Sequence, residues 1–351
     1  MRGLTSRTVE DGEQGAVSVI MAVMLVALLG FTALAVDVGM LYAERAQLQN
    51  GADAAALGVA QVCAKAPSST DCSSGSPIAT NLANANANDR LAALRSVDVN
   101  PSTNTATVTT MSRDASRSDG RVSLFFARVF GDDDAAVSAT ASARWGSPLK
   151  GTTVFPMTVS LCQVENRVDG AVQLLQLHGT TSSPGPNGVC TPSSSGQVVP
   201  GGFGWLTQAG TSCGGFIDLA LQQAGGAPGN SGPGNCNDTY DFWKAEITAG
   251  RKPVILIPVF WKVDGTGSGA IYRMNTFAAY EITGWKFSGG NEGVGVRDVF
   301  HNTAAHSSAT TACTGDCRGI IGKFVKYVSL SEGYTLGPVN QFGATIVQMS
   351  G

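Results

Sequence analysis

The longest hydrophobic pattern in the chain is an unbroken apolar run near its N-terminus. Residues 15–36 contain no ionisable side chain. As a helix this run is roughly 33 Å long, enough to cross the ~30 Å hydrocarbon core of a bilayer. We therefore predict a transmembrane helix over 15–36, after a cytoplasmic N-terminus over 1–14. A cleavable signal peptide is the alternative, although its apolar core is usually shorter.

The helical pattern continues beyond the apolar run. Residues 37–63 contain no Pro and are rich in Ala, Gln and Leu, which favour helix. An apolar stripe at helical spacing consists of Leu41, Leu48, Ala52, Ala55, Val59 and Val62. We predict a helical extension over 37–63 whose stripe packs on the chain's own next domain. Packing on a helix of another chain is the second interpretation.

Shorter patterns predict a small exported α+β unit over 64–146. We expect a helix at 78–94, a hairpin between 97–99 and 106–110, a helix at 122–130 and a strand at 136–145.

Beyond Gly146-Ser147-Pro148 the sequence alternates short β-branched or aromatic runs with Gly-rich turns, at 154–161, 172–178, 254–263, 272–287, 324–330 and 344–349. This spacing predicts a mostly-β exported domain over 150–351, either a sandwich or an irregular barrel. One helix is expected within it, at 217–223. The predicted fold class of the whole chain is α+β.

All cysteines lie after the apolar run. The eight are Cys63, Cys72, Cys162, Cys190, Cys213, Cys236, Cys313 and Cys317. An even number in an exported segment is typical of disulfides formed in an oxidising compartment. This supports a single-pass topology with the N-terminus inside and the C-terminal domains extracytoplasmic. Pairing of sequence neighbours is the simplest of the many possible connectivities.

A metal site is the alternative use of the last two cysteines. His301 and His306 precede Cys313 and Cys317 in an H-x4-H-x6-C-x3-C arrangement. Zinc sites usually have closer cysteine pairs, of the CxxC type. We therefore favour a disulfide and expect no metal and no cofactor.

The charge of the chain argues against a nucleic-acid partner. The formal net charge is −3, and only 14% of the residues are charged. No basic run of five or more residues occurs, so the electrostatic footprint of a nucleic-acid-binding protein is missing.

An ordered set of residues lies in and after the apolar run. Its members are Gly15, Asp37, Gly39, Tyr42, Arg45, Leu48, Gln49, Asp53 and Leu57. Segment 13–60 thereby resembles TadE/TadG-like Flp pilus-assembly membrane proteins. The resemblance implies a non-enzymatic, single-pass bacterial envelope protein that anchors or scaffolds a Tad-type pilus assembly or secretion system. The implied partners are the lipid bilayer and pilus-assembly membrane proteins, with self-association through the N-terminal helix as a further option.

One departure refines this expectation. Ile20 lies five residues after Gly15, where processed pilins carry Glu. We therefore expect an unprocessed anchor rather than a pilin subunit.

Three segments resemble catalytic or ligand sites but have simpler explanations. Residues 114–118 read D-x-S-x-S, like the start of a von Willebrand A metal site, yet they follow a polar stretch that is typical of a solvated turn. The Gly-rich residues 265–269 lie between two predicted strands, which favours a hairpin turn over a phosphate loop. The acidic run 132–134 suits a loop cap better than a calcium site. If all eight cysteines pair, no thiol is free for nucleophilic catalysis, so we expect no enzyme.

The sequence also suggests environments for Asp37 and for four of the tryptophans. Asp37 follows the apolar run, where we expect it to be hydrated at the membrane interface; pairing with a partner helix is the alternative. Trp205, Trp243, Trp261 and Trp285 are expected in the core of the β domain. If they instead lined a groove, the chain would be a surface-displayed glycan- or matrix-binding module, an adhesin-like alternative.

Overall fold

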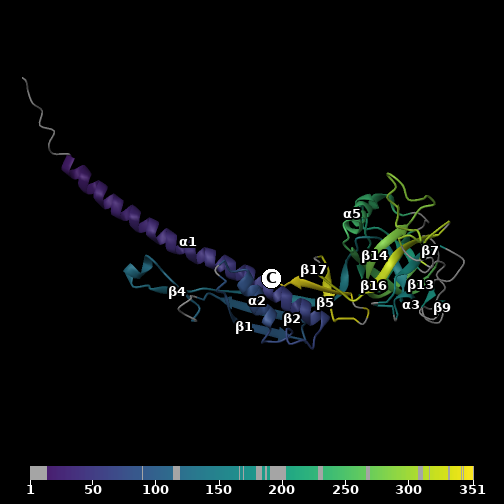
Figure 1. Cartoon of the computed structure of the whole chain (residues 1–351), viewed down its shortest axis with the longest axis horizontal. Coiled ribbons are helices and arrows are strands. Elements are labelled where there is room, and N and C mark those ends of the chain that lie inside the picture. The colour runs from purple at the N-terminus through teal and green to yellow at the C-terminus, as the bar shows by residue number, and fades with distance from the viewer. Residues whose placement is uncertain are drawn as a thin grey trace, which may run out of the picture.

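A computed structural model of the chain describes residues 14–350 except 89, 114–118, 166, 169, 179–183, 186–187, 190–202, 228–231, 266–268, 307–310, 316, 331–332, 341 and 343. A long N-terminal helix leads into two main β-sheets (Figure 1). The first half of this helix projects away from the sheets, so the molecule is elongated.

Helix α1 (Gln14–Lys65) unites the predicted membrane span and its extension in one element of 52 residues. Its first part is long and apolar enough to cross a membrane, and the side chains of the most apolar stretch are not buried by the rest of the chain. Further along, Leu48, Ala52, Ala55 and Val59 of the predicted stripe are fully buried. The stripe packs on the chain's own next domain, as we favoured.

The first sheet lies against the second half of α1. Its strands follow the order β1 (Ala93–Asn100), β2 (Thr105–Met111), β5 (Ser138–Thr152), β19 (Ala344–Met349) and β17 (Tyr327–Leu330). Alternate residues of β2, namely Ala106, Val108 and Thr110, are buried. Because successive side chains of a strand point to opposite faces, these three share the face that packs on α1. Helix α2 (Pro77–Ala85) packs beside α1.

The second sheet forms the distal lobe. Its strands follow the order β12 (Ala224–Ala227), β10 (Phe203–Leu206), β6 (Met157–Ser160), β13 (Val254–Asp264), β14 (Ile271–Lys286), β16 (Arg318–Val325) and β7 (Gln173–His178), with β15 (Val299–Phe300) beside β14. Strand β12 also pairs with β14, which closes β12, β10, β6, β13 and β14 into a ring. The pairing therefore has the closed connectivity of an irregular barrel, one of the two predicted forms.

Helices and short elements complete this lobe. They are α3 (Leu161–Val164), η2 (Gly234–Cys236), α5 (Asn237–Thr248) and the two-residue strands β8 (Pro184–Gly185) and β9 (Gly188–Val189). Trp243 of α5 belongs to an aromatic core that also includes Trp205 and Trp285. The α+β class predicted from sequence, a long helix followed by a mostly-β region, is thus confirmed.

Strand β5 connects the two lobes. Its first half pairs with β2 and β19, while its second half pairs with β11 (Phe216–Asp218) and β18 (Thr335–Gly337), which belong to the same sheet. The boundary suggested by sequence at 146–150 falls inside this strand. Strand β19 returns the chain to the first sheet, where Ile346 pairs with Gly146 in β5.

The predicted hairpin and all six predicted β runs are present. Val97 pairs with Val108 and Val99 with Ala106 across β1 and β2. Each of the six runs contains strand residues. The register of β13 shifts between Val259 and Phe260, close to Pro258.

Three predicted helices were wrong in extent or kind. The helix expected at 78–94 ends at Ala85, because the Asn86 side chain donates to the Leu82 carbonyl and caps the helix. In place of the helix expected at 217–223, the chain forms β11 up to Asp218 and then a turn, and Ile217 of β11 is buried. Short apolar runs of this kind suit either a strand or a helix.

The third wrong prediction is the helix at 122–130. The chain there forms β3 (Arg121–Ser123), the 3₁₀ turn η1 (Ala127–Phe130) and β4 (Asp134–Ala136). A distant carboxylate accepts hydrogen bonds from the backbone at the start of η1, and this contact overrides the local helical pattern.

Helix α5 was not predicted. Only Tyr240 and Trp243 of its residues are buried, so its apolar periodicity is too sparse to identify from the sequence.

Candidate functional site

The candidate functional site is the junction between α1 and the side hairpin, which we define as residues 121–136. Strands β3 and β4 pair antiparallel, and η1 forms the tip between them. The side hairpin lies along α1 and extends away from the sheets, where the β4 label marks it in Figure 1. At its base, Ser112 donates its backbone N–H to the Val137 carbonyl, which fastens the hairpin to the first sheet.

Asp37 fastens the tip of the side hairpin to α1. Its carboxylate accepts backbone N–H groups from Phe125 at 3.0 Å, Phe126 at 2.8 Å and Ala127 at 2.6 Å. The Asp37 residue is only 3% exposed. The expected hydration of Asp37 at the interface is therefore wrong: the hairpin backbone replaces water around the carboxylate.

The electrostatics of Asp37 favour its charged form. Burial raises the pKa of this carboxyl, but the three backbone N–H groups and the nearby Arg128 outweigh burial and hold the pKa below its usual value. Asp37 is thus an ionised anchor for the tip, one residue past the apolar segment.

A shallow groove follows on the same side of the helix. Its volume is about 330 Å³, and it is lined by Val38, Leu41, Tyr42 and Arg45 of α1 and by residues 135–138. Tyr42 is largely exposed. The groove thus brings Tyr42 and Arg45 of the predicted set close to the Asp37 junction.

The next turns of α1 are fixed to the first sheet by polar contacts. The buried Thr110 hydroxyl donates to the Leu48 carbonyl at 2.8 Å. Gln49 donates to the Asp53 carboxylate at 2.8 Å, one helical turn away. Leu57 packs at the margin of the helix–sheet core.

The predicted set thus divides by environment. Asp37 and Leu48 hold other elements, whereas Gly39 has open space around the position of a Cβ. Gly15 lies in α1, but its surroundings are outside the part of the chain that the structure describes. The backbone partners of Asp37 were missed from sequence, because they lie 88 to 90 residues away and carry no local pattern.

Three disulfides join sequence neighbours. They are Cys63–Cys72, Cys213–Cys236 and Cys313–Cys317. Cys190, the expected partner of Cys162, lies outside the described residues. The first bridge closes the loop that follows α1.

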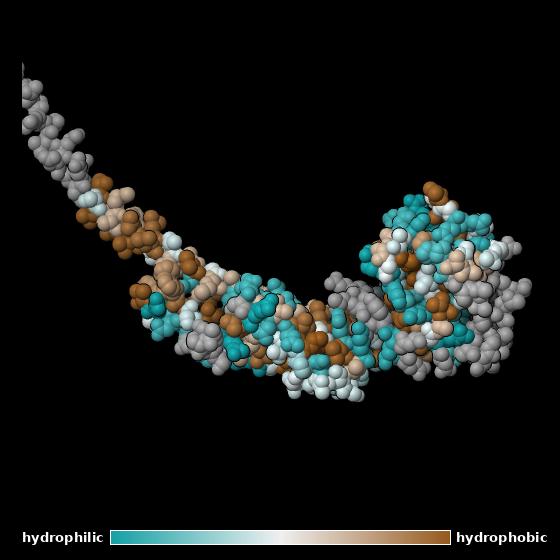
Figure 2. All heavy atoms as spheres, in the orientation of Figure 1, coloured by the Kyte–Doolittle hydropathy of each residue, from teal (hydrophilic) through white to brown (hydrophobic). Residues whose placement is uncertain are grey.

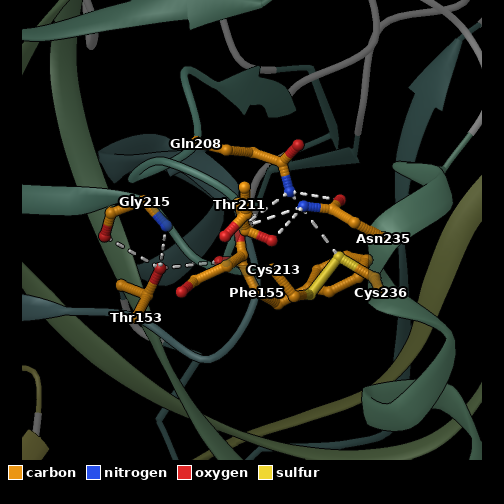
Figure 3. The surroundings of a disulfide bond; sticks show 9 residues. Thr153, Phe155, Gln208, Thr211, Cys213, Gly215, Asn235 and Cys236 are labelled. Atoms are coloured by element: carbon orange, nitrogen blue, oxygen red, sulfur yellow. Dashed lines mark hydrogen bonds between the residues drawn. A yellow bond between two sulfur atoms is a disulfide. The ribbon is translucent and has the colours of Figure 1, made fainter.

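The second disulfide is part of a structural junction (Figure 3). Buried Cys236, just before α5, is bonded to Cys213 in the loop after β10. Beside it, Gln208 donates to the Asn235 side-chain oxygen at 2.7 Å, and Asn235 donates to the Thr211 carbonyl at 3.0 Å. These contacts fix a loop rather than form a reactive centre.

The histidine–cysteine candidate has a different arrangement from a metal site. The rings of His301 and His306 stack with centroids 3.9 Å apart, while Cys313 and Cys317 bond to each other. Burial, followed by the neighbouring His306, lowers the pKa of His301. Among the described residues, no three His, Cys, Asp or Glu side chains gather as metal ligands.

The remaining candidates have structural roles or lie outside the description. Strands β13 and β14 flank the Gly-rich residues 265–269 as an antiparallel pair, which is the hairpin context we expected. The D-x-S-x-S motif at 114–118 lies outside the described residues. In the acidic run 132–134, Asp134 forms an ion pair with Arg121 across the side hairpin.

Most of the candidate tryptophans are core residues. Trp205, Trp243 and Trp285 are buried, and Trp261 alone of the four is exposed. They pack with other aromatic rings in edge-on and tilted contacts. The three buried rings are therefore core residues rather than the lining of a glycan-binding groove.

Comparison with known proteins identifies the N-terminal segment. Residues 15–62 match the family model described as "Putative Flp pilus-assembly TadE/G-like". This match confirms the resemblance of segment 13–60 and indicates a role in Flp pilus assembly. No curated protein and no solved structure matches the chain. The matched segment contains the apolar run, Asp37 and the packed second half of α1.

Proposed function

We propose that the chain is a non-enzymatic, single-pass protein of the bacterial cell envelope that anchors or scaffolds surface assembly in a Tad/Flp-type pilus system. Residues 15–36 span the cell membrane with the N-terminus inside. The two sheets lie on the extracytoplasmic side. This proposal joins the family match with the two environments of α1.

The observation that carries the proposal is the continuity of α1. A helix of 52 residues is roughly 78 Å long, and no loop separates its apolar part from its packed part. The exported sheets are therefore attached to the membrane span through helix alone. Such a connection suits a scaffold, because it fixes the distance of the sheets from the membrane.

The disulfides support the proposed orientation. All three described bridges lie after the apolar segment. Disulfides persist in oxidising compartments outside the cytoplasm. The sheets and the bridges thus belong on the same, extracytoplasmic side.

The apolar half of α1 is the surface proposed for membrane partners. Figure 2 shows hydrophobic residues along this half, whereas polar residues cover much of the two lobes. Lipid surrounds this segment, and pilus-assembly membrane proteins or a second copy pack against part of it.

A complementation experiment tests the anchoring role. A strain lacking the chain receives the full chain, residues 37–351 exported by a cleavable signal, or the full chain with 15–36 replaced by an unrelated Leu/Ala span. We expect the deletion to abolish piliation and the exported soluble form not to restore it. Unchanged piliation in the deletion strain would contradict the proposal, as would full rescue by the soluble form.

The variant with the Leu/Ala span distinguishes simple membrane anchoring from anchoring that also needs specific helix contacts. Rescue by the Leu/Ala span indicates that anchoring alone suffices. Failure, with normal membrane insertion, indicates specific helix contacts. A photo-crosslinker at exposed Tyr42 then identifies the neighbour, which we expect to be a pilus-assembly membrane protein.

A further inference from the structure

The tip of the side hairpin exposes apolar side chains that the fold does not use. Phe125 is 64% exposed, Val129 80% and Phe130 73%. No other part of the described chain covers them. Since exposed apolar clusters on a folded domain usually mark a contact surface, the tip requires an occupant.

The position of the tip identifies that occupant. The Asp37 carboxylate, one residue past the apolar segment, binds the backbone of Phe125 and Ala127 within 3.0 Å. The tip is therefore held at the level where α1 leaves the hydrocarbon core. The apolar surface of the span and that of the tip lie in the same part of the molecule (Figure 2).

The composition of the tip suits the membrane–water interface. The Arg128 guanidinium lies over the Phe125 ring, 5.2 Å from its centroid. Aromatic rings with an adjacent Arg place apolar area among acyl chains and charge among headgroups. Exposed Asp132 and Asp133 follow the tip, so its insertion is limited to the interfacial layer, where carboxylates keep their water.

We propose that the tip, formed by Phe125, Val129 and Phe130, inserts shallowly into the outer leaflet of the same membrane that α1 spans. This inference rests on the proposed membrane anchoring by residues 15–36. The side hairpin then acts as a second, peripheral contact that sets the tilt of α1 and of the sheets behind it. Asp37 is the positioning residue, because its hydrogen bonds hold the tip beside the helix.

Spin labels on the full-length chain with its disulfides intact test the insertion. Single cysteines are introduced by Val129→Cys and Phe130→Cys at the tip, Val23→Cys in the apolar segment and Val294→Cys on the distal lobe. The labelled protein is reconstituted in vesicles of phosphatidylcholine with a minor fraction of phosphatidylglycerol. Collision rates with oxygen, which partitions into lipid, and with a water-soluble nickel chelate are then measured.

We expect the oxygen-to-nickel ratio at both tip positions to exceed that at Val294 several-fold and to fall below that at Val23. A tip ratio equal to the Val294 ratio, with Val23 in lipid, overturns the tip insertion and leaves the anchor intact. A Val23 ratio equal to the Val294 ratio overturns the anchor itself. A raised ratio at only one tip position also overturns the proposal.

Protein contact at the tip gives a different result. If a second copy covers the tip, both collision rates fall and the spectra broaden, and dilution with unlabelled protein removes the broadening. That outcome overturns lipid insertion. The Phe125→Ser/Phe130→Ser pair, added to the Val129 label, is expected to return the ratio to the Val294 value, whereas an unchanged ratio contradicts the role of these rings.

Discussion

The two halves of α1 have opposite relations to the rest of the chain. Residues 17–36 carry large aliphatic side chains that no described part of the protein covers. Residues 48–64 are rich in Ala and Gly, and many of them are buried against the first sheet and α2.

The difference shows how one helix serves two environments. Lipid is a fluid that fills space around bulky side chains, so the first half needs length and hydrophobicity but no fixed shape. The second half meets a sheet and a helix, and small residues allow close approach. At Gly51, an added Cβ would lie 3.2 Å from the Ala83 carbonyl oxygen in α2. A charged side chain should therefore disrupt the first half of α1, whereas a larger side chain should disrupt the second half.

The largest effect is expected from charge in the apolar half. Leu25→Arg with Val26→Arg places two cations near the middle of the span, at a cost of about 3 kcal/mol each. We expect the doubly substituted chain to be lost from the carbonate-resistant membrane fraction. Ala46→Arg, on an exposed position past the span, is the matched control and should remain membrane-bound. Equal extraction of the two variants would contradict the assignment of 15–36 as the span.

A smaller effect is expected from bulk in the packed half. Ala55 is fully buried between α1 and the first sheet, so Ala55→Leu overfills the interface and should destabilise the fold by roughly 1–3 kcal/mol. Thermal unfolding of the full chain in detergent, followed by circular dichroism, measures this loss.

Ala43→Leu provides the control for Ala55→Leu. Ala43 is exposed, so the same added volume should leave the unfolding temperature almost unchanged. If both variants unfold at the same temperature, the interface is not close-packed as described.

The Thr110 hydroxyl provides a further test of the packed half, because it binds the Leu48 carbonyl where that half begins. Thr110→Val removes the hydrogen bond to the Leu48 carbonyl and should cost about 1 kcal/mol. Thr109→Val is matched in sequence and chemistry, but its hydroxyl meets Thr140 on the exposed face of the sheet. Chemical denaturation should separate the two variants, and a larger loss for Thr109→Val would be the contrary result.

The sequence predicted the helix well and its attachments poorly. The charge-free run and the 37–63 stripe are local periodic patterns, so both halves of α1 and the buried face are readable from residue order. The hydrogen bonds of Asp37 join residues about 90 positions apart, and the pairing of Ile346 with Gly146 joins residues about 200 positions apart. Neither leaves a local pattern, and the first of them converts an apparent helix at 122–130 into the side hairpin.

The smallest effect concerns Asp37, at the point where the two halves of α1 meet. Because its folded pKa lies below the usual value of about 3.9, the carboxylate stabilises the tip fully above that pH. This contribution is lost as the pH falls through the lower, folded pKa. A spin label at Val129 should therefore keep an immobile spectrum from neutral pH to about 4 and become mobile only in stronger acid. Asp37→Asn retains the size of the side chain but not its charge, so its label should be more mobile at neutral pH and nearly independent of pH. A wild-type label whose mobility changes near neutral pH, or an Asp37→Asn label identical to wild type throughout, would show that another contact holds the side hairpin to the helix.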